Sequence, residues 1–252
     1  MTPAQRARFD IREKRHTGTT RGLAPGYVQC NLAVVPEKLA FEFLLYCQRN
    51  ARACPVLEVC DPGSPEPRQL APGADLRTDL PKYCVYENGR GRELGDVREL
   101  WRADLVAFLI GSGISFDAAL ERAGVPTGPH RWVLNSRIPT VPAGRFRGDM
   151  VVTMRWLTPG QAIVATQVSS RFPHNHGAPI HIGDPAAIGA DLERPLFGGT
   201  VPALPAGMVP VFWACGVTPQ QAALEAKIDF MIAHAPAHGF ITDLEADKFC
   251  IP

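Results

Sequence analysis

The sequence lacks the features that would tie the chain to a membrane or to nucleic acid. None of its apolar runs is long enough to span a bilayer, and the N-terminus has no apolar segment typical of a signal peptide. Lys and Arg total 26 against 25 Asp and Glu, so the formal net charge is only +1. We therefore expect a cytoplasmic protein with no nucleic-acid or membrane partner, and leave a homo-oligomer open.

Paired cysteines and cofactor motifs are also missing. The seven cysteines include no CxxC pair, and an odd number of thiols is typical of a reduced protein rather than of a disulfide framework. The chain has no dinucleotide fingerprint, Walker loop or HExxH motif, so we expect no organic cofactor. With 252 residues and 46% hydrophobic content, it can bury a core without disulfides or metals.

Apolar periodicity predicts both helices and buried strands. A helix is expected near the N-terminus, where the arginine-rich cluster at 6–15 would form a solvated face. Pro36 opens a second helix with an apolar stripe, and a further helix is expected from 218 to about 234. The expected strands are 55–60, 83–86, 105–111, 150–157, 162–172, 209–216 and 239–243.

Three turns, at 111–115, 183–185 and 216–218, each follow an apolar strand and open a helix. Ser115 and Thr218 would cap the first and the last of these helices. Ligands of α/β proteins bind at such strand ends, so we expect a pocket where the three turns meet. The candidate substrate-binding residues in these turns are Ser112, Gly113, Ser115, Gly216 and Thr218.

The stretch RFPHNHGAPIHIGDPAAIG, residues 171–189, concentrates charged and imidazole side chains among Gly and Pro. Its histidines are open to three interpretations: structural residues, acid/base catalysts, or a minority interpretation as a divalent metal site formed by His174, His176 and His181. Asp184, directly before a proline, also has the pattern of a helix N-cap.

A second polar cluster alternates Asp75, Arg77 and Asp79 ahead of the strand at 83–86. Alternating charges usually mark one solvated face of a strand. The alternative is that Arg77 is a carboxylate clamp held by its flanking aspartates.

Segments spread in order over nearly the whole chain resemble the D-glutamate cyclase family, whose members are also described as hydro-lyases. The resembling segments are GLAPGYVQCNLAVVP, ACPVLEV, LAPGADLRTDLPKY, DLVAFLIG with the following SFD, IPTVPAGRFRGDMVVTMR, RFPHNHGAPIHIGDPAAIG, VPVFWACGVTPQ and FITDL. Relatives carry Cys-Ser-Phe where this chain has residues 112–114, Tyr-Arg-Thr-Asn where it has 134–137, and often Cys at Thr140. These departures leave the identity of the substrate open.

The resemblance implies an α/β fold: a three-layer α/β/α sandwich with a mixed sheet, interrupted by a smaller two-layer α+β domain. The composition changes near Thr127, which puts the inserted domain at 127–176 and the larger domain at 1–126 and 177–252. The family activity implied is elimination of water, with closure of D-glutamate to 5-oxo-D-proline as the named reaction.

Such a reaction needs a base, an acid and donors for a developing oxyanion. His176 and His181 are the predicted acid/base pair, with Asp184 orienting one imidazole, while Arg171, or Arg77 beside Asp75, would clamp a carboxylate. Backbone N–H groups at 216–218 could face the oxyanion. Two other classes remain: a non-catalytic protein that binds a small carboxylate, and a metal-dependent amidohydrolase that uses the three histidines.

Overall fold

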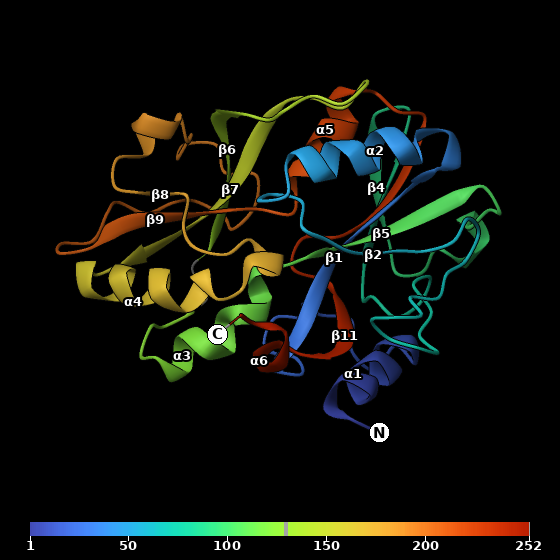
Figure 1. The fold of residues 1–252 in the computed structure, drawn as a ribbon, viewed down its shortest axis with the longest axis horizontal. Coiled ribbons are helices and arrows are strands. Elements are labelled where there is room, and N and C mark those ends of the chain that lie inside the picture. The colour runs from blue at the N-terminus through green and yellow to red at the C-terminus, as the bar shows by residue number, and fades with distance from the viewer. Residues whose placement is uncertain (129–130, 252) are drawn as a thin grey trace.

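A computed structural model describes residues 1–128 and 131–251 and shows two antiparallel β-sheets with helices packed around them (Figure 1). The larger sheet has seven strands in the order β2-β5-β1-β10-β3-β4, with β11 also paired to β1. Its strands are β1 (Tyr27–Pro36), β2 (Val56–Val59), β3 (Tyr83–Glu87), β4 (Arg90–Leu94), β5 (Leu105–Gly111), β10 (Phe230–His234) and β11 (Phe240–Glu245).

Strand β1 is the centre of the larger sheet, and every one of its residues after Tyr27 is buried. Successive side chains of a strand point to opposite faces. Leu32 accordingly joins the core on one face and Ala33 the core on the other. The strand also changes partners: Ala33 pairs with β10, whereas Cys30 pairs with β11. The sheet therefore forks beside β1, with β10 along one part of the strand and β11 along the other. This fork forms part of the wall of the cavity described below.

The smaller sheet has four strands in the order β6-β7-β9-β8. These are β6 (Trp132–Pro139), β7 (Asp149–Leu157), β8 (His181–Ile182) and β9 (Val209–Ala214). One face packs in a separate core around Trp132 and Phe212. The other face carries Trp213 into the core that also contains β1 and β5, so the two sheets share one hydrophobic interior.

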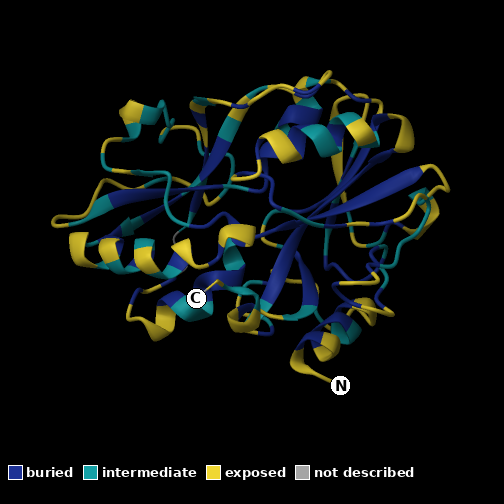
Figure 2. Ribbon diagram, in the orientation of Figure 1, coloured by how far each residue is buried: buried dark blue, intermediate teal, exposed yellow. Residues whose placement is uncertain are grey.

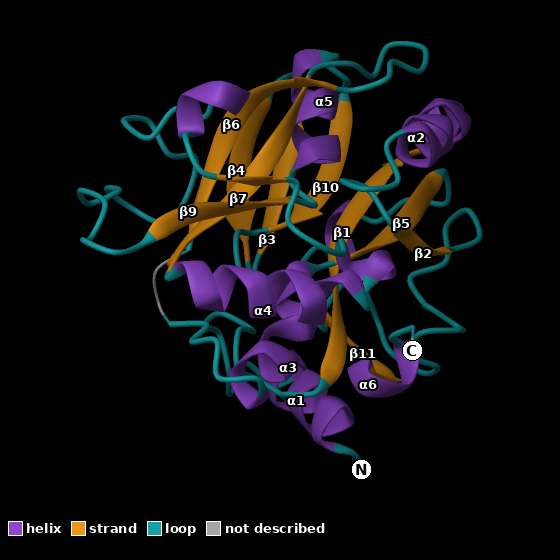
Figure 3. Ribbon diagram, turned by 60° about the vertical axis from the view of Figure 1, so that its left-hand side comes forward, coloured by secondary structure: helices purple, strands orange, loops and turns teal. Residues whose placement is uncertain are grey.

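The helices lie on two sides of the molecule, with their outer faces exposed and the strands between them buried (Figures 1 and 2). In Figures 1 and 3, α2 and α5 lie on one side, while α1, α3, α4 and α6 gather near the termini on the other. Their bounds are α1 (Pro3–Arg12), α2 (Glu37–Arg49), α3 (Asp117–Arg122), α4 (Pro159–Ser170), α5 (Thr218–Glu225) and α6 (Ala246–Phe249), with 3-10 turns η1 (Arg98–Leu100), η2 (Gly113–Phe116), η3 (Pro173–Asn175) and η4 (Pro185–Ile188). No helix in the described ranges is long and apolar enough to cross a bilayer.

The fold combines helices and sheets, as the sequence predicts. The prediction of a mixed sheet, with parallel and antiparallel strands, is wrong. Every strand pairing in the described residues is antiparallel. The three-layer arrangement and the inserted domain at 127–176 stay predictions. Strands β6 and β7 do share a sheet, but that sheet also takes β8 and β9 from beyond residue 176.

The run 162–172, predicted as a strand, lies largely in helix α4. Thr158 Oγ1 accepts a hydrogen bond from the Gln161 N–H at 3.2 Å, and Gln161 Oε1 accepts one from the Thr158 N–H at 3.0 Å. This capping box, with Pro159 at the first helical position, satisfies backbone donors that only a helix start leaves free. The capping chemistry therefore outweighs the β-propensity of the apolar run.

The helix predicted from 218 to 234 ends early, at Glu225, and its second half is strand β10. Lys227 adopts a left-handed φ of 49°, which breaks the helix, and all five residues of β10 are buried between β1 and β3. A short, fully buried apolar run has no reliable period, so only the tertiary partners decide its state. Thr218 does not cap α5, because its hydroxyl accepts from the Val151 N–H at 3.0 Å.

Candidate functional site

A cavity of about 890 Å³ lies between the two sheets. Its walls come from the loop at 19–27, the inner part of β1, the turn after β5, strand β7, the turn after β9 and the end of β10. The fork beside β1 opens onto this space, because His234 at the end of β10 and Asn31 on β1 both line it. The cavity is large enough for a small metabolite.

Three arginines converge on one carboxylate in the cavity wall. Arg131 Nη2 lies 2.6 and 2.7 Å from the Asp117 oxygens, and Arg155 Nη2 lies 2.7 Å from Asp117 Oδ1. Arg21 Nε is 3.7 Å from Asp117 Oδ2. Burial opposes ionisation of Asp117, but Arg131 and Arg155 more than offset it and lower the pKa of its carboxyl. Glu121 also lines the cavity and acts on Arg21, so three positive charges face two negative charges there.

Arg155 is the most deeply buried member of this cluster, at 4% exposure. Burial, followed by repulsion from Arg131, lowers the pKa of its guanidinium to about 10. Its Nε and Nη1 have no hydrogen-bond partner within the described part of the chain, while its guanidinium carbon lies 5.3 Å from the Trp213 ring centre. A buried guanidinium with unused donors favours an anion.

His176 lines the same cavity and is only 3% exposed. Its Nδ1 lies 3.1 Å from the Arg52 carbonyl oxygen. Because a carbonyl only accepts hydrogen bonds, Nδ1 must carry the proton and Nε2 has the free lone pair. Burial lowers the pKa of the imidazole to about 4, although the bond to the Arg52 backbone opposes this shift. At neutral pH the residue is an uncharged proton acceptor.

The loop that carries His176 is tied to the end of β5. Asn175 Nδ2 donates to the Ser112 carbonyl at 3.2 Å and to Ser115 Oγ at 3.0 Å. At Gly111, a Cβ atom would lie 1.8 Å from the His174 carbonyl oxygen, so only glycine allows this approach. His176 itself has a left-handed φ of 78°, an uncommon conformation outside glycine and asparagine. The surrounding bonds therefore hold the imidazole in a specified position.

Four of the residues predicted for the site line the cavity, namely His176, Ser112, Gly113 and Gly216. Two of the three predicted turns, those after β5 and β9, thus meet at the cavity. The third turn, at 183–185, does not line it. Close approach of Asn31 explains the glycine at 216, where a Cβ atom would lie 1.9 Å from Asn31 Nδ2. Their functional roles stay predictions.

Ser115 and Thr218 lie behind the cavity wall rather than in it. Ser115 Oγ accepts from the Gln29 N–H at 2.9 Å, and the Thr218 N–H donates to the Cys215 carbonyl at 3.0 Å. The prediction that Ser115 caps a helix is wrong, because α3 has Phe116 at its N-cap and no side-chain cap, while Ser112 caps the preceding turn η2. Both hydroxyl groups are occupied by the backbone and brace the two turns.

The other polar residues of the 171–189 stretch do not reach the cavity. His181 Nε2 donates to the Asp184 carbonyl at 2.8 Å, and Asp184 caps η4 as its sequence pattern predicts. Arg171 Nε donates to the Ile251 carbonyl at 3.1 Å near the C-terminus. His174 packs on Phe249. Across residues 1–128 and 131–251, no three His, Cys, Asp or Glu side chains gather as a metal-ligand group, so the three histidines do not form a common site.

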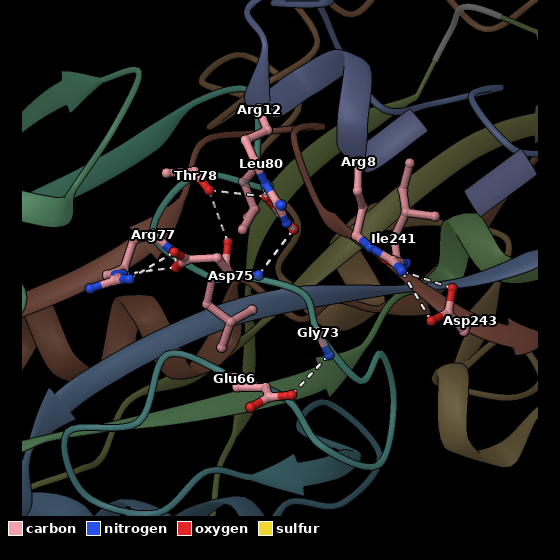
Figure 4. A network of polar contacts seen from close by, with 12 residues as sticks. Arg8, Arg12, Glu66, Gly73, Asp75, Arg77, Thr78, Leu80, Ile241 and Asp243 are labelled. Carbon is pink, nitrogen blue, oxygen red and sulfur yellow. Dashed lines mark hydrogen bonds and ion pairs between the residues drawn. The ribbon is translucent and has the colours of Figure 1, made fainter. Parts of the chain in front are cut away.

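Asp75 and Arg77 belong to a separate polar network under α1 (Figure 4). The Asp75 carboxylate accepts from Arg77 Nε and Nη2 at 2.9 and 2.8 Å, and the buried Asp79 accepts from Arg12 Nη2 at 2.6 Å. The segment forms turns rather than a strand, and it lines no part of the cavity. Arg8 is also buried there, so the N-terminal arginines are not simply a solvated face.

Several cavity residues escaped the sequence analysis: Asp117, Arg131, Arg155, Asn31 and His234. Two of them carry a signal that could have been used. Arg155 interrupts the otherwise apolar run MVVTMRWL, and His234 ends the apolar run FMIAH. An ionisable side chain inside a buried strand needs a partner or a function. Cys215 also lines the cavity, and burial raises the pKa of its thiol.

The net-positive cavity with a neutral, positioned imidazole is the candidate functional site. Residues 106–243 match the family model described as D-glutamate cyclase. A Geobacillus kaustophilus protein named "putative hydro-lyase" is 52% identical, with 97% of this chain and 95% of the relative covered. A Stutzerimonas stutzeri protein of the same name is 50% identical, with 98% and 96% covered. The chain belongs to the D-glutamate cyclase family and is an enzyme of the lyase class.

Proposed function

We propose that this enzyme removes water from a small acidic substrate and closes D-glutamate to 5-oxo-D-proline. The observation that carries the proposal is the buried Arg155, whose Nε and Nη1 are unpartnered among the described residues, in the same cavity as the neutral His176. A substrate carboxylate would satisfy the guanidinium, and the imidazole would move protons. The cavity thus supplies both halves of the reaction: recognition and acid/base chemistry.

Substrate recognition is assigned to the arginine cluster rather than to Arg171 or Arg77. A guanidinium offers parallel N–H donors that match the two oxygens of a carboxylate. In Arg155, Nη2 belongs to both parallel donor pairs and is already given to Asp117. Nε and Nη1 are buried, unpartnered single donors in the described part of the chain, so the α-carboxylate would be held by one N–H of Arg155 and by the positive charge of the cluster. Asp117 holds Arg131 and Arg155 together without neutralising the pair.

Proton transfer is assigned to His176. Closure forms a bond between the amine nitrogen and the side-chain carboxyl carbon and breaks one carbon–oxygen bond. Two protons leave the ammonium nitrogen, and both reach the departing oxygen, which leaves as water. His176 Nε2 can take each proton from nitrogen and return it to oxygen, so the imidazole is regenerated. No electrons are transferred, and we propose that no redox cofactor participates.

The same groups would serve elimination of water from a small hydroxy acid. In that reaction His176 would remove a proton from carbon and return it to the leaving hydroxyl group. Product analysis separates the two reactions, because only closure of glutamate yields a lactam.

The direct test is incubation of the purified enzyme with D- and L-glutamate, with 5-oxoproline followed by chiral chromatography. We expect turnover of the D-enantiomer, and its loss in His176→Ala. His181→Ala is the matched control, because His181 lies outside the cavity and should leave the rate unchanged. Absence of a lactam from both enantiomers, in folded protein, would withdraw glutamate. Binding of 5-oxoproline without turnover would instead favour a non-catalytic carboxylate-binding protein.

A further inference from the structure

A second histidine, His234, lines the cavity from the larger sheet. We propose that neutral His234 donates a hydrogen bond through Nε2–H to the substrate oxygen that becomes negative when the carboxyl carbon is attacked. This inference rests on the proposed function and adds a catalytic residue to it. His234 was not among the predicted site residues, and its role is inferred from its hydrogen bonds.

The first of these bonds comes from the fork beside β1. Ala33 pairs with Ala233 on β10, and Cys30 pairs with Phe240 on β11. Between these pairings, the Leu32 N–H donates to His234 Nδ1 at 3.3 Å instead of continuing the ladder. The imidazole therefore occupies the place of a backbone acceptor at the fork.

The second bond comes from α5. Gln220, only 5% exposed, presents its amide Nε2 to His234 Nδ1 at 3.0 Å. The Leu32 carbonyl oxygen lies farther from the same nitrogen, at 3.4 Å. With two N–H donors directed at it, Nδ1 is the acceptor, and a neutral imidazole then carries its single proton on Nε2.

The ring is neutral because it is buried. His234 is 4% exposed, and burial lowers the pKa of its imidazole to about 4. Because Nδ1 is directed at Leu32 and Gln220, the ring edge left to the cavity is the one that carries Nε2. This atom has no hydrogen-bond partner in residues 1–128 and 131–251.

The two cavity histidines are thus complementary. His176 offers an acceptor because its Nδ1 donates to a carbonyl, while His234 offers a donor because its Nδ1 accepts from two N–H groups. The first suits proton removal, and the second suits stabilisation of an oxyanion without adding a charge. A positioned donor of this kind contributes a factor of roughly 10²–10³ to kcat.

The tautomer can be tested without turnover. Two-bond ¹H–¹⁵N correlation spectra of the intact wild-type enzyme, with His234→Gln used to assign the resonance, show which ring nitrogen carries the proton. We expect Nε2–H at neutral pH. A proton on Nδ1 would overturn the inference whether or not glutamate is the substrate, so this failure is distinct from failure of the proposed function.

Kinetics test the role. His234→Ala should lower kcat roughly 100-fold or more with KM within about threefold, whereas His234→Gln, which retains an N–H donor, should recover part of the loss. Gln220→Glu should also lower kcat, because a carboxylate accepts from Nδ1–H and leaves Nε2 as an acceptor, visible in the same spectra. A kcat within threefold of wild type in folded His234→Ala, or a rise in KM alone, would overturn the inference. Should the alanine variant not fold, an undiminished kcat in Gln220→Glu with the proton moved to Nδ1 would overturn it equally.

Discussion

At the scale of single residues, Arg155 is the buried cation of the cavity. It is buried against Trp213 and Phe116, shares Asp117 with Arg131, and keeps two nitrogens without a protein partner in the described ranges. Burying a charge is costly unless partners compensate for the lost water. A bound carboxylate would supply that compensation, which gives the free enzyme a reason to bind small anions.

Replacing Arg155 with Met should raise KM for D-glutamate by at least about tenfold, since charge-assisted hydrogen bonds contribute about 1.5–3 kcal/mol. Stability should change less, because an apolar side chain of similar length can fill a buried site. Steady-state kinetics measure the effect. The control is Arg194→Met, which removes an arginine whose side chain is 87% exposed and paired only at the surface. Equal KM values for the two variants would contradict the assignment.

At the scale of elements, the end of β5 positions the loop that carries His176. Gly111 lets the backbone at His174 pass over the strand, and Asn175 then ties the loop to Ser112 and Ser115. The strand is buried throughout, so it is a rigid support for the loop. His176 is therefore placed by contacts between segments that lie more than sixty residues apart in sequence, as the separation of 63 between Asn175 and Ser112 shows.

Gly111→Ala should lower stability by about 1–3 kcal/mol or more and should also lower kcat, because the added methyl group must displace the His176 loop. Urea denaturation and kinetics measure the two effects. Gly160→Ala is the contrasting variant: its Cβ would meet open space in α4, and alanine should leave kcat unchanged and add up to about 1 kcal/mol. Wild-type stability and kcat in Gly111→Ala would contradict the crowding argument.

At the scale of the whole molecule, two buried neutral histidines make stability depend on pH. Burial lowers the pKa of both His176 and His234 to about 4, against about 6.5 in the unfolded chain. His238 is shifted in the same direction, also chiefly by burial. Between these pH values the unfolded chain binds more protons, so stability falls as pH falls.

We expect the free energy of unfolding to be unaffected by His176 and His234 above pH 6.5 and to fall by about 3 kcal/mol per histidine on acidification to pH 4. Urea unfolding at several pH values measures this loss. His234→Gln should show a shallower fall over the same window, because glutamine does not titrate. Parallel curves for the variant and the wild type would show that His234 is not buried in its neutral form.

Local chemistry predicted several elements correctly. The apolar stripe after Pro36 forms α2, the run LVAFLIG forms β5, and Asp184 caps η4. These features depend on neighbours within a few residues, where side-chain caps and steric preferences act.

The sequence by itself determined the family, through segments that resemble it in order, and the elements whose start signals are local. Tertiary structure alone decided that 162–170 is helical, that 230–234 is a strand, and that Arg131, Arg155 and Asp117 form one cluster. It also places His181, Arg171 and Arg77 outside the lining of the cavity. The physical reason is that burial, charge balance and the tautomers of His176 and His234 depend on groups brought together by long-range packing, which no local pattern encodes.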